Sequence, residues 1–285
     1  MKKRHKFTLG YIYGEQNLGK DEEAFIKLAK KKKIELVMFN IYKKITEAEL
    51  EEKAKKCDII FNNSAEEFAY EIIKTLEALG KKVIDSSQTY YYTEDKWIFA
   101  LRCRENNIPT PETILLSENI NIARKNLKEF AHWPVILKRI EGTMGQYVEK
   151  ADNLKQAEEI IHKFWVKGNE KLPIIAQEII YSPSYRVTTI GGKIVQTALK
   201  ESKGWKCTGV YEKDFKKFEI DKVLEKIIKK TAKLFKINIC GIDLLKKEGK
   251  WVVLEINSTP AFDFFENERE MLIGNVLDFL KNKAK

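Results

Sequence analysis

Short apolar stretches alternate with longer segments of helical spacing in the first third of the chain. The apolar stretches predict strands at 7–13, 34–40, 59–62 and 83–84. Between them, apolar residues recur at helical intervals, which predicts helices over about 22–33, 48–56 and 65–79. Strands that alternate with helices in this way are typical of a small parallel sheet covered by helices. Because no G-x-G-x-x-G motif follows a strand, a dinucleotide fingerprint is not supported.

The pattern changes after residue 93. We expect a helix from Thr93 to about Asn106, followed by an extended linker, since Pro109 and Pro111 disfavour helix in the residues before them. Strands and helices beyond the linker form a compact α+β unit, and from residue 173 short strands surround one long helix at about 221–235. We therefore predict an α/β protein built of α+β lobes, divided at 1–93, 94–172 and 173–285.

Composition narrows the class of protein. The chain has 285 residues, of which 44% are hydrophobic and 33% charged, too apolar for a disordered chain and too charged for a membrane protein. We expect a cytoplasmic location, with no membrane association. The 52 Lys+Arg and 42 Asp+Glu residues give a formal charge of +10, which allows an anionic nucleotide, an acidic protein or nucleic acid as a partner. A lysine-rich surface without a specific partner explains the same charge.

Cysteine and histidine give no metal motif. The four cysteines and three histidines are scattered, without C-x-x-C spacing, so a zinc site or a disulfide framework is not expected. Any metal would therefore be held by oxygen ligands. Asp243, Glu255 and Asn257 are candidates, because they interrupt apolar strands with side chains that are costly to bury without a counter-charge. Two carboxylates and an amide oxygen suit Mg²⁺ or Mn²⁺. The alternative is that each acid pairs with a lysine at a sheet edge.

Two further segments carry polar residues next to strands. Lys138 ends a strand and is followed by Gly142, Thr143 and Gly145, a loop whose backbone N–H groups can turn toward an anion. A glycine hairpin without a ligand is the alternative. The segment Gln177–Ile180 places a polar pair before apolar backbone, which suits recognition of an adenine edge by main-chain hydrogen bonds.

Taken in order, these residues resemble the ATP-grasp superfamily, and within it the RimK-like amino-acid ligases. The shared motifs are Lys-x-x-Glu-Gly-Thr-x-Gly at 138–145, Asp-Lys at 95–96, Gln-Glu at 177–178, Gly-Ile-Asp at 241–243 and Glu-Ile-Asn-Ser-x-Pro at 255–260. The resemblance implies a Rossmann-like pre-ATP-grasp domain, a small central lid lobe and a C-terminal catalytic lobe. It also implies ATP and Mg²⁺ or Mn²⁺ as cofactors, with the metal on Asp243, Glu255 and Asn257.

The resemblance assigns roles to further residues. Arg186 and Lys200 are implied to act in catalysis, and the implied nucleotide-binding residues are Lys96, Lys138, Gly142, Thr143, Gly145, Gln177, Glu178, Ile179, Ile180, Ser184 and Lys206. Three features of the sequence depart from the family pattern. Ser184 replaces an acid that contacts the ribose, Leu199 replaces a basic residue beside Lys200, and a shortened segment at 204–209 leaves Lys206 in place of an arginine.

The implied activity is ATP-dependent ligation of a carboxylate to an amine through an acyl phosphate, with glutamate or a similar amino acid as the amine. The carboxylate acceptor would be a protein tail, a carrier protein, an acidic peptide or a small coenzyme. A homo-oligomer is compatible with the family, and nucleic acid is not expected as a partner. Two other functions stay open at this point, namely an ATP-grasp kinase of a polyol or inositol phosphate and a nucleotide- or RNA-binding protein without turnover.

Overall fold

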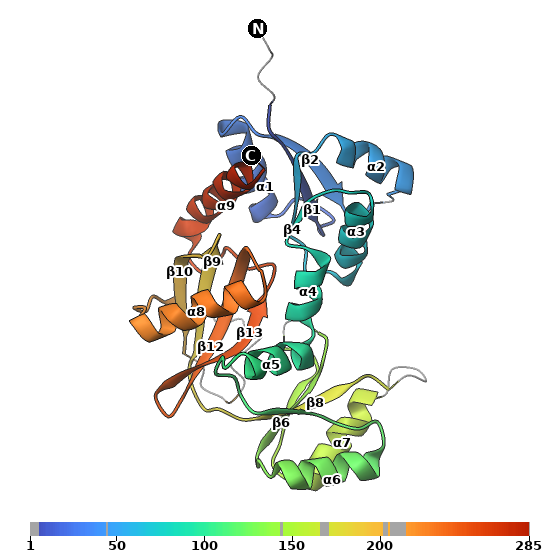
Figure 1. Ribbon diagram of the computed structural model, residues 1–285, viewed down its shortest axis with the longest axis vertical. Coiled ribbons are helices and arrows are strands. Elements are labelled where there is room, and N and C mark those ends of the chain that lie inside the picture. Colours follow the sequence, from blue (N-terminus) through green and yellow to red (C-terminus); the bar gives the residue numbers. More distant parts are fainter. Residues whose placement is uncertain are drawn as a thin grey trace.

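The computed structural model describes residues 6–43, 45–142, 145–165, 171–201, 205 and 215–284. Their strands pair into three sheets, which succeed one another along the chain (Figure 1). Helices cover these sheets, and the α/β class predicted from the sequence is confirmed.

The first sheet is parallel and has the strand order β2-β1-β3-β4. Its strands are β1 (Thr8–Tyr13), β2 (Glu35–Asn40), β3 (Ile59–Asn62) and β4 (Val83–Ile84). Its helices are α1 (Lys20–Lys31), α2 (Glu47–Lys55) and α3 (Glu67–Ala78). Leu9 and Tyr11 of β1 pack toward α1, while Ile12 packs toward α2 and α3. Both faces of the sheet are therefore buried, which explains the uninterrupted apolar stretches in the sequence.

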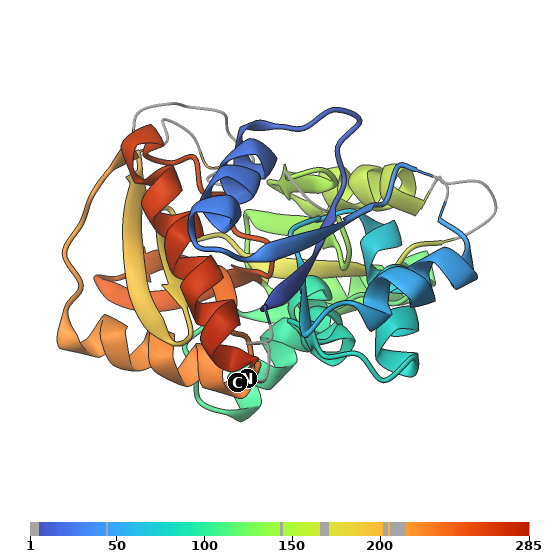
Figure 2. The same ribbon diagram turned by 90° about the horizontal axis from the view of Figure 1, so that it is seen from above.

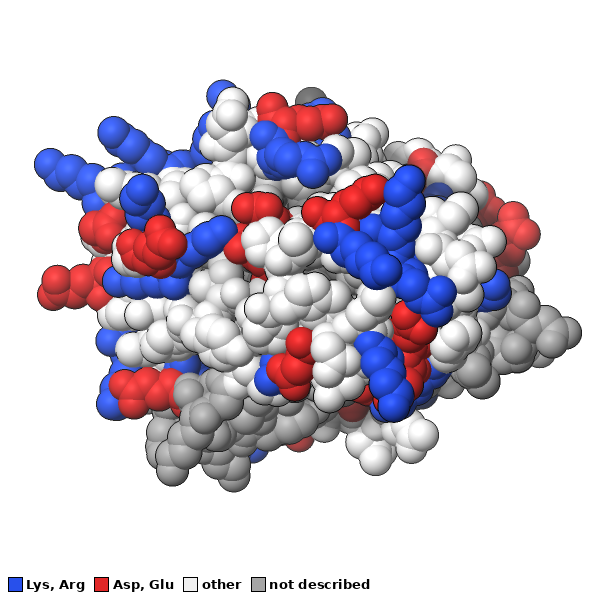
Figure 3. Space-filling model, turned by 90° about the horizontal axis from the view of Figure 1, so that it is seen from below, with Lys and Arg blue, Asp and Glu red and all other residues white. Residues whose placement is uncertain are grey.

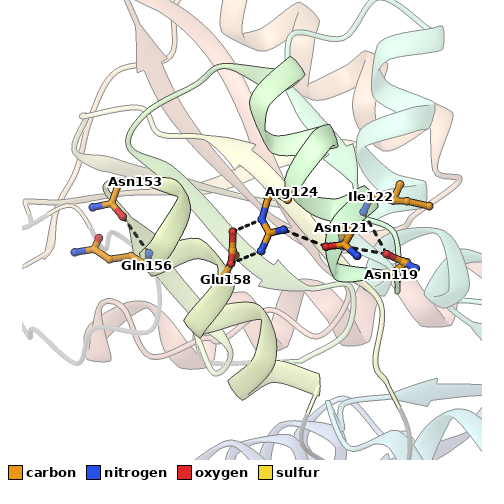
Figure 4. A network of polar contacts seen from close by, with 7 residues as sticks. All are labelled: Asn119, Asn121, Ile122, Arg124, Asn153, Gln156 and Glu158. Atoms are coloured by element: carbon orange, nitrogen blue, oxygen red, sulfur yellow. Dashed lines mark hydrogen bonds and ion pairs between the residues drawn. The ribbon is translucent and has the colours of Figure 1, made fainter.

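The central sheet is antiparallel, with the order β5-β8-β6-β7. Its strands are β5 (Thr113–Leu115), β6 (Val135–Arg139), β7 (Val148–Ala151) and β8 (Ile174–Glu178), and helices α6 (Ile120–Phe130) and α7 (Leu154–Trp165) cover one face. Arg124 of α6 binds both carboxylate oxygens of Glu158 on α7, at 2.6 and 2.8 Å (Figure 4). Because this pair joins the two helices on one side of the sheet, the opposite face is left for the site.

The third sheet is antiparallel, with the order β11-β10-β9-β12-β13. Its strands are β9 (Ser184–Ile190), β10 (Lys193–Lys200), β11 (Phe215–Lys216), β12 (Ile239–Lys247) and β13 (Lys250–Asn257). Helix α8 (Lys222–Leu234) covers one face. Asp221 caps this helix by accepting a hydrogen bond from the Leu224 N–H, and its second oxygen accepts one from Trp251 Nε1, both at 2.7 Å. The cap therefore fixes α8 to β13.

The end of the chain returns to the N-terminal sheet. A short 3-10 helix (Glu266–Glu268) leads into α9 (Arg269–Lys283), which lies beside α1 in Figures 1 and 2. Leu272 and Val276 of α9 belong to the same buried core as Leu9. The final helix therefore completes the cover of the first sheet.

A buried carboxylate also ties the N-terminal unit to the third sheet. Asp85, which is only 2% exposed, accepts hydrogen bonds from the Asn238 N–H at 2.9 Å and the Ile239 N–H at 3.2 Å. These residues lie at the start of β12. The strand that carries Asp243 is therefore anchored at its first residue.

Two segments differ from the sequence prediction. The helix expected over Thr93–Asn106 begins only at Lys96, as α5 (Lys96–Glu105), and a separate helix, α4 (Ser87–Glu94), precedes it. The two are separate because Asp95 leaves the helical conformation and caps α5 through the N–H groups of Trp97 and Ile98. Strand β8, which we expected to open the C-terminal lobe at residue 173, pairs with β5 and β6 instead.

The surface shows charges of both signs. In Figure 3, which views the end of the molecule that carries α6, basic and acidic side chains are interspersed with uncharged surface. No helix among the described residues is long and apolar enough to cross a membrane.

Candidate active site

The three predicted metal ligands lie together on the face of the third sheet opposite α8. Asp243 and Glu255 are direct partners across β12 and β13, and Asn257 lies opposite Gly241 on the same pair of strands. Asn257 Nδ2 donates to Asp243 Oδ2 at 3.1 Å. The hairpin thus brings two carboxylates and an amide to one face.

A β-bulge produces this arrangement. The register passes from the pair Asp243–Glu255 to the pair Leu244–Val253, so Leu254 is an extra residue on β13. Val253 and Glu255 therefore lie on opposite faces of the sheet although they are two residues apart. Without the bulge, Leu254 would lie opposite Asp243, and Glu255 would lie opposite Ile242 in the buried row that packs against α8.

Arg186 is the closest cation to Asp243 in the described structure. It lies across from Asp243 on β9, donating through Nε and, at 2.7 Å, through Nη2 to both carboxylate oxygens. The Arg186 guanidinium extends over Gly241, where an added Cβ would lie 2.6 Å from Nη1, and its other side faces the ring of Phe264 at 5.5 Å. The counter-charge expected for a buried acid is therefore an arginine on the neighbouring strand, and not a lysine at the edge.

Glu255 lies between this pair and the central lobe. Burial raises the pKa of its carboxyl, and the neighbouring Asp243 raises it further. Three cations act in the opposite direction, namely Lys138, Lys96 and Arg186. Cations from two lobes thus converge on one carboxyl group of the third sheet.

The donor set is compatible with a hard divalent cation. Asp243 is 4% exposed and Glu255 faces it directly, an arrangement of like charges that a cation would relieve. The described residues contain no cluster of three or more His, Cys, Asp or Glu side chains that could hold a metal. A cation held by two carboxylates and an amide oxygen would therefore take its remaining ligands from phosphate or water, as Mg²⁺ commonly does.

The central lobe supplies the predicted lysines. Lys138 at the end of β6 is 7% exposed, and Lys96 at the start of α5 donates to the Gly142 carbonyl oxygen at 2.8 Å. Gly142 and Gly145 have φ of 124° and 68°, conformations that favour glycine. Lys96 therefore holds the base of the glycine loop, while Thr143 lies outside the described residues.

The polar residues at the end of β8, Gln177 and Glu178, make contacts within the protein. The Glu178 carboxylate accepts from the Glu112 N–H at 2.9 Å and from Lys247 Nζ at 2.6 Å. Gln177 is likewise buried in the central sheet. The Glu178 side chain thus joins the linker to the β12–β13 hairpin, and Ile179 and Ile180 follow it as the connection to β9.

Two of the three departures from the family pattern lie on β9 and β10. Ser184 is buried at the start of β9, directly opposite Lys200 at the end of β10. These two residues lie on the same face as Arg186, one step further along the strands. Lys206 lies outside the described residues.

Sequence reasoning missed an apolar group beside the carboxylates. It consists of Ile180, Leu245, Val252 and Leu254, brought together by the connection between β8 and β9 and by the bulged hairpin. Leu245 and Val252 are cross-strand partners on the same face as Asp243. The bulge that places Leu254 there has no sequence signature, although the apolar residues at 252 and 254, on the same strand as Glu255, were visible in the sequence.

A family model described as RimK-like ATP-grasp domain matches residues 93–277. The chain belongs to the RimK-like ATP-grasp family. The resemblance inferred from the sequence is thereby confirmed. As a member, the chain is an ATP-grasp ligase, an ATP-dependent enzyme that forms carbon–nitrogen bonds. This membership favours the ligase over the kinase and over the binding protein without turnover. ATP-grasp ligases use ATP with a divalent metal ion, and they bind amino-acid or carboxylate substrates.

Individual relatives agree with the family. The chain is 28% identical over 225 residues to a probable alpha-L-glutamate ligase of Psychromonas ingrahamii, covering 75% of this chain and 72% of the relative. It is 24% identical over 202 residues to the coenzyme gamma-F420-2:alpha-L-glutamate ligase of Methanocaldococcus jannaschii, with 70% of each chain covered. The D-alanine–D-alanine ligase of Bacillus anthracis complexed with ATP superposes with a TM-score of 0.73 at 17% identity, covering 98% and 97% of the two chains.

Proposed function

We propose that this ATP-grasp ligase joins the amino group of glutamate, or of a similar amino acid, to a carboxylate acceptor through an acyl phosphate. The acceptor is a protein tail, a carrier protein, an acidic peptide or a small coenzyme. The observation that carries the proposal is the convergence of Lys138, Lys96 and Arg186 on the paired carboxylates. The names of the two glutamate ligases among the relatives support the choice of amino acid.

The reaction requires one anion to attack another, which the site's cations make possible. The acceptor carboxylate attacks the γ-phosphorus of ATP, and the bond to the leaving ADP oxygen breaks. The amine then attacks the acyl carbon, phosphate leaves, and the amine loses a proton. In this proposal Lys138 and Lys96 bind the phosphates, while Arg186 and Lys200 screen the attacking carboxylate.

Asp243, Glu255 and Asn257 would hold Mg²⁺ or Mn²⁺, which when bound supplies positive charge to the phosphate oxygens. The protein's own part is to keep these ligands close before the nucleotide arrives. Asp85 contributes at a distance because it anchors the first residue of β12. The bulge at Leu254 contributes directly because it directs Glu255 to this face.

The apolar group formed by Ile180, Leu245, Val252 and Leu254 is the proposed floor of the adenine site. It lies beside the carboxylates, so a nucleotide seated there would extend its phosphates toward Lys138. The N–H and C=O groups of Ile179 and Ile180, which follow β8, would read the adenine edge, since the Glu178 N–H already donates to the Glu112 carbonyl oxygen. Ser184, whose side chain is short and neutral, would leave the ribose without an acidic partner at this position.

In this proposal the molecule works as three lobes, with β8 added to the central one.

The test is a phosphate-release screen with ATP and Mg²⁺, in which amino acids are combined with candidate carboxylates. We expect release that needs both an amine and a carboxylate, and its loss in Asp243→Asn. Asp278→Asn is the matched control, since that carboxylate lies on α9 and pairs with Lys32 at 2.8 Å. Formation of ADP that needs a hydroxyl compound and releases no phosphate would favour the kinase, and no amine-dependent phosphate release across the screen would refute the ligase.

A further inference from the structure

A chain of buried polar groups crosses the central sheet on the face that carries Lys138. Lys138 Nζ donates to Gln177 Oε1 at 2.8 Å, and Gln177 Nε2 donates to Thr113 Oγ1 at 2.9 Å. Thr113 Oγ1 in turn donates to the Pro111 carbonyl oxygen at 2.9 Å. The three side chains are 7%, 5% and 5% exposed, respectively, so water cannot readily replace these bonds.

The direction of every bond in this chain is fixed by its two ends. The Pro111 carbonyl can only accept, so the Thr113 hydroxyl donates its proton to that carbonyl and accepts a hydrogen bond from Gln177. The Lys138 ammonium can only donate, so the Gln177 amide must present its oxygen to it. The opposite orientation of the amide would place its N–H₂ against the ammonium. Only one arrangement therefore satisfies all the donors and acceptors.

The chain also connects elements that belong to different parts of the lobe. Thr113 lies on β5, Gln177 on β8 and Lys138 on β6, and these strands are neighbours in the sheet. Its far end is the carbonyl of Pro111, in a linker whose prolines restrict the backbone. A lysine side chain has several rotatable bonds, so an anchored ammonium loses less freedom when an anion binds it.

We propose that Gln177 and Thr113 are positioning residues, which hold the Lys138 ammonium in place for the nucleotide phosphates. The proposal rests on the proposed function, in which Lys138 binds phosphate. It assigns the Gln177 side chain to the phosphates through Lys138, and it leaves the adenine edge to main-chain groups of the segment that follows β8. It also makes the hydroxyl of Thr113, which touches neither nucleotide nor metal, a determinant of nucleotide affinity.

The test compares two threonines of one segment. Thr113→Val removes the hydroxyl and keeps the side-chain shape. Thr110→Val is the matched control, because the buried Thr110 Oγ1 has no hydrogen-bond partner among the described residues. The probes are the β,γ-imido analogue of ATP with Mg²⁺ and adenosine, and dissociation constants are measured by calorimetry and competition.

We expect Thr113→Val to weaken the analogue by up to about tenfold, the upper end of the effect of one neutral hydrogen bond, while adenosine binds within twofold of wild type. Thr113→Ser should restore the affinity, and Thr110→Val should leave it unchanged. Equal weakening of adenosine and analogue, equal behaviour of the two valine variants, or failure of the serine variant would each overturn the positioning role. A wild-type protein that binds no analogue would instead refute the proposed function.

Discussion

Gly241 offers a way to disturb the site without altering any of its charges. A Cβ at this position would lie 2.6 Å from Arg186 Nη1 and 2.9 Å from its Cδ, closer than real Cβ atoms approach. We therefore expect Gly241→Ala to push the guanidinium away from β12. Ordinary contact begins near 3.4 Å, so Nη1 must move by about 0.8 Å.

The size of the effect follows from the Arg186–Asp243 pair. Nη2 lies 2.7 Å from Asp243 Oδ2. The added Cβ would press on Nη1 and Cδ, the edge of the guanidinium that faces away from Asp243, so a shift of about 0.8 Å turns Nε and Nη2 out of their bidentate alignment with the carboxylate. A lost hydrogen bond between charged groups costs about 1.5–3 kcal/mol. The Arg186 side chain is 18% exposed, so water recovers part of that energy and we expect about 2 kcal/mol.

Denaturant unfolding and phosphate release measure the two consequences. We expect a lower denaturant midpoint and at least tenfold slower release, because Arg186 is displaced from the proposed acyl-phosphate site. Gly274→Ala is the matched control, since its Cβ would meet only Lys32 Cε at 3.7 Å and alanine favours a helix. If Gly241→Ala unfolds and reacts like Gly274→Ala, the guanidinium is free to move and the pair does not order the site.

Other perturbations test the remaining parts of the structure. Burial raises the pKa of Asp85 from 3.8 to about 6. The folded state therefore keeps a proton that the unfolded chain releases, and this stability, present below about pH 4, is lost as the pH rises to 6. Asp85→Asn should remove this part of the pH dependence. The free energy of unfolding of the wild type, less that of the variant, should therefore fall by up to about 3 kcal/mol between pH 4 and pH 7. A difference that stays constant with pH would contradict the raised pKa. Treatment with EDTA should abolish phosphate release, and either Mg²⁺ or Mn²⁺ should restore it, since both accept oxygen ligands; release that survives EDTA would exclude a metal requirement. Lys96→Met should weaken binding of the ATP analogue about tenfold without affecting binding of adenosine, because the bond to the Gly142 carbonyl is lost. Unchanged affinity for the analogue would show that Lys96 does not contribute to phosphate binding.

The sequence predicted the parts of the molecule that rest on local pattern. The four strands of the first sheet were found where apolar residues run together, because a strand covered on both faces carries few polar residues. The acids at 243 and 255 stood out for the same physical reason, as charges within apolar strands. The glycines at 142 and 145, expected in a loop, adopt positive φ, a conformation that glycine permits.

Features that depend on pairing between distant strands could not be read in advance. The sequence predicted that strand β8 would begin a new lobe at residue 173, yet its partners are β5 and β6. The bulge at Leu254 depends on register, which no single strand specifies. Asp95 did carry a local signal, since an aspartate that caps a helix also ends the one before it.

The charges at the site explain why metal and nucleotide should bind together. Lys138, Lys96 and Arg186 slightly outweigh the carboxylates of Asp243 and Glu255, so the protein alone offers little net attraction to a triphosphate. The carboxylates would also repel the phosphates directly, at short range and in a partly buried site where Coulomb energies are large. A divalent cation between them converts both repulsions into attractions. Nucleotide affinity should therefore depend steeply on the metal, and a nucleotide that bound equally well with and without it would show that these carboxylates do not face the phosphates.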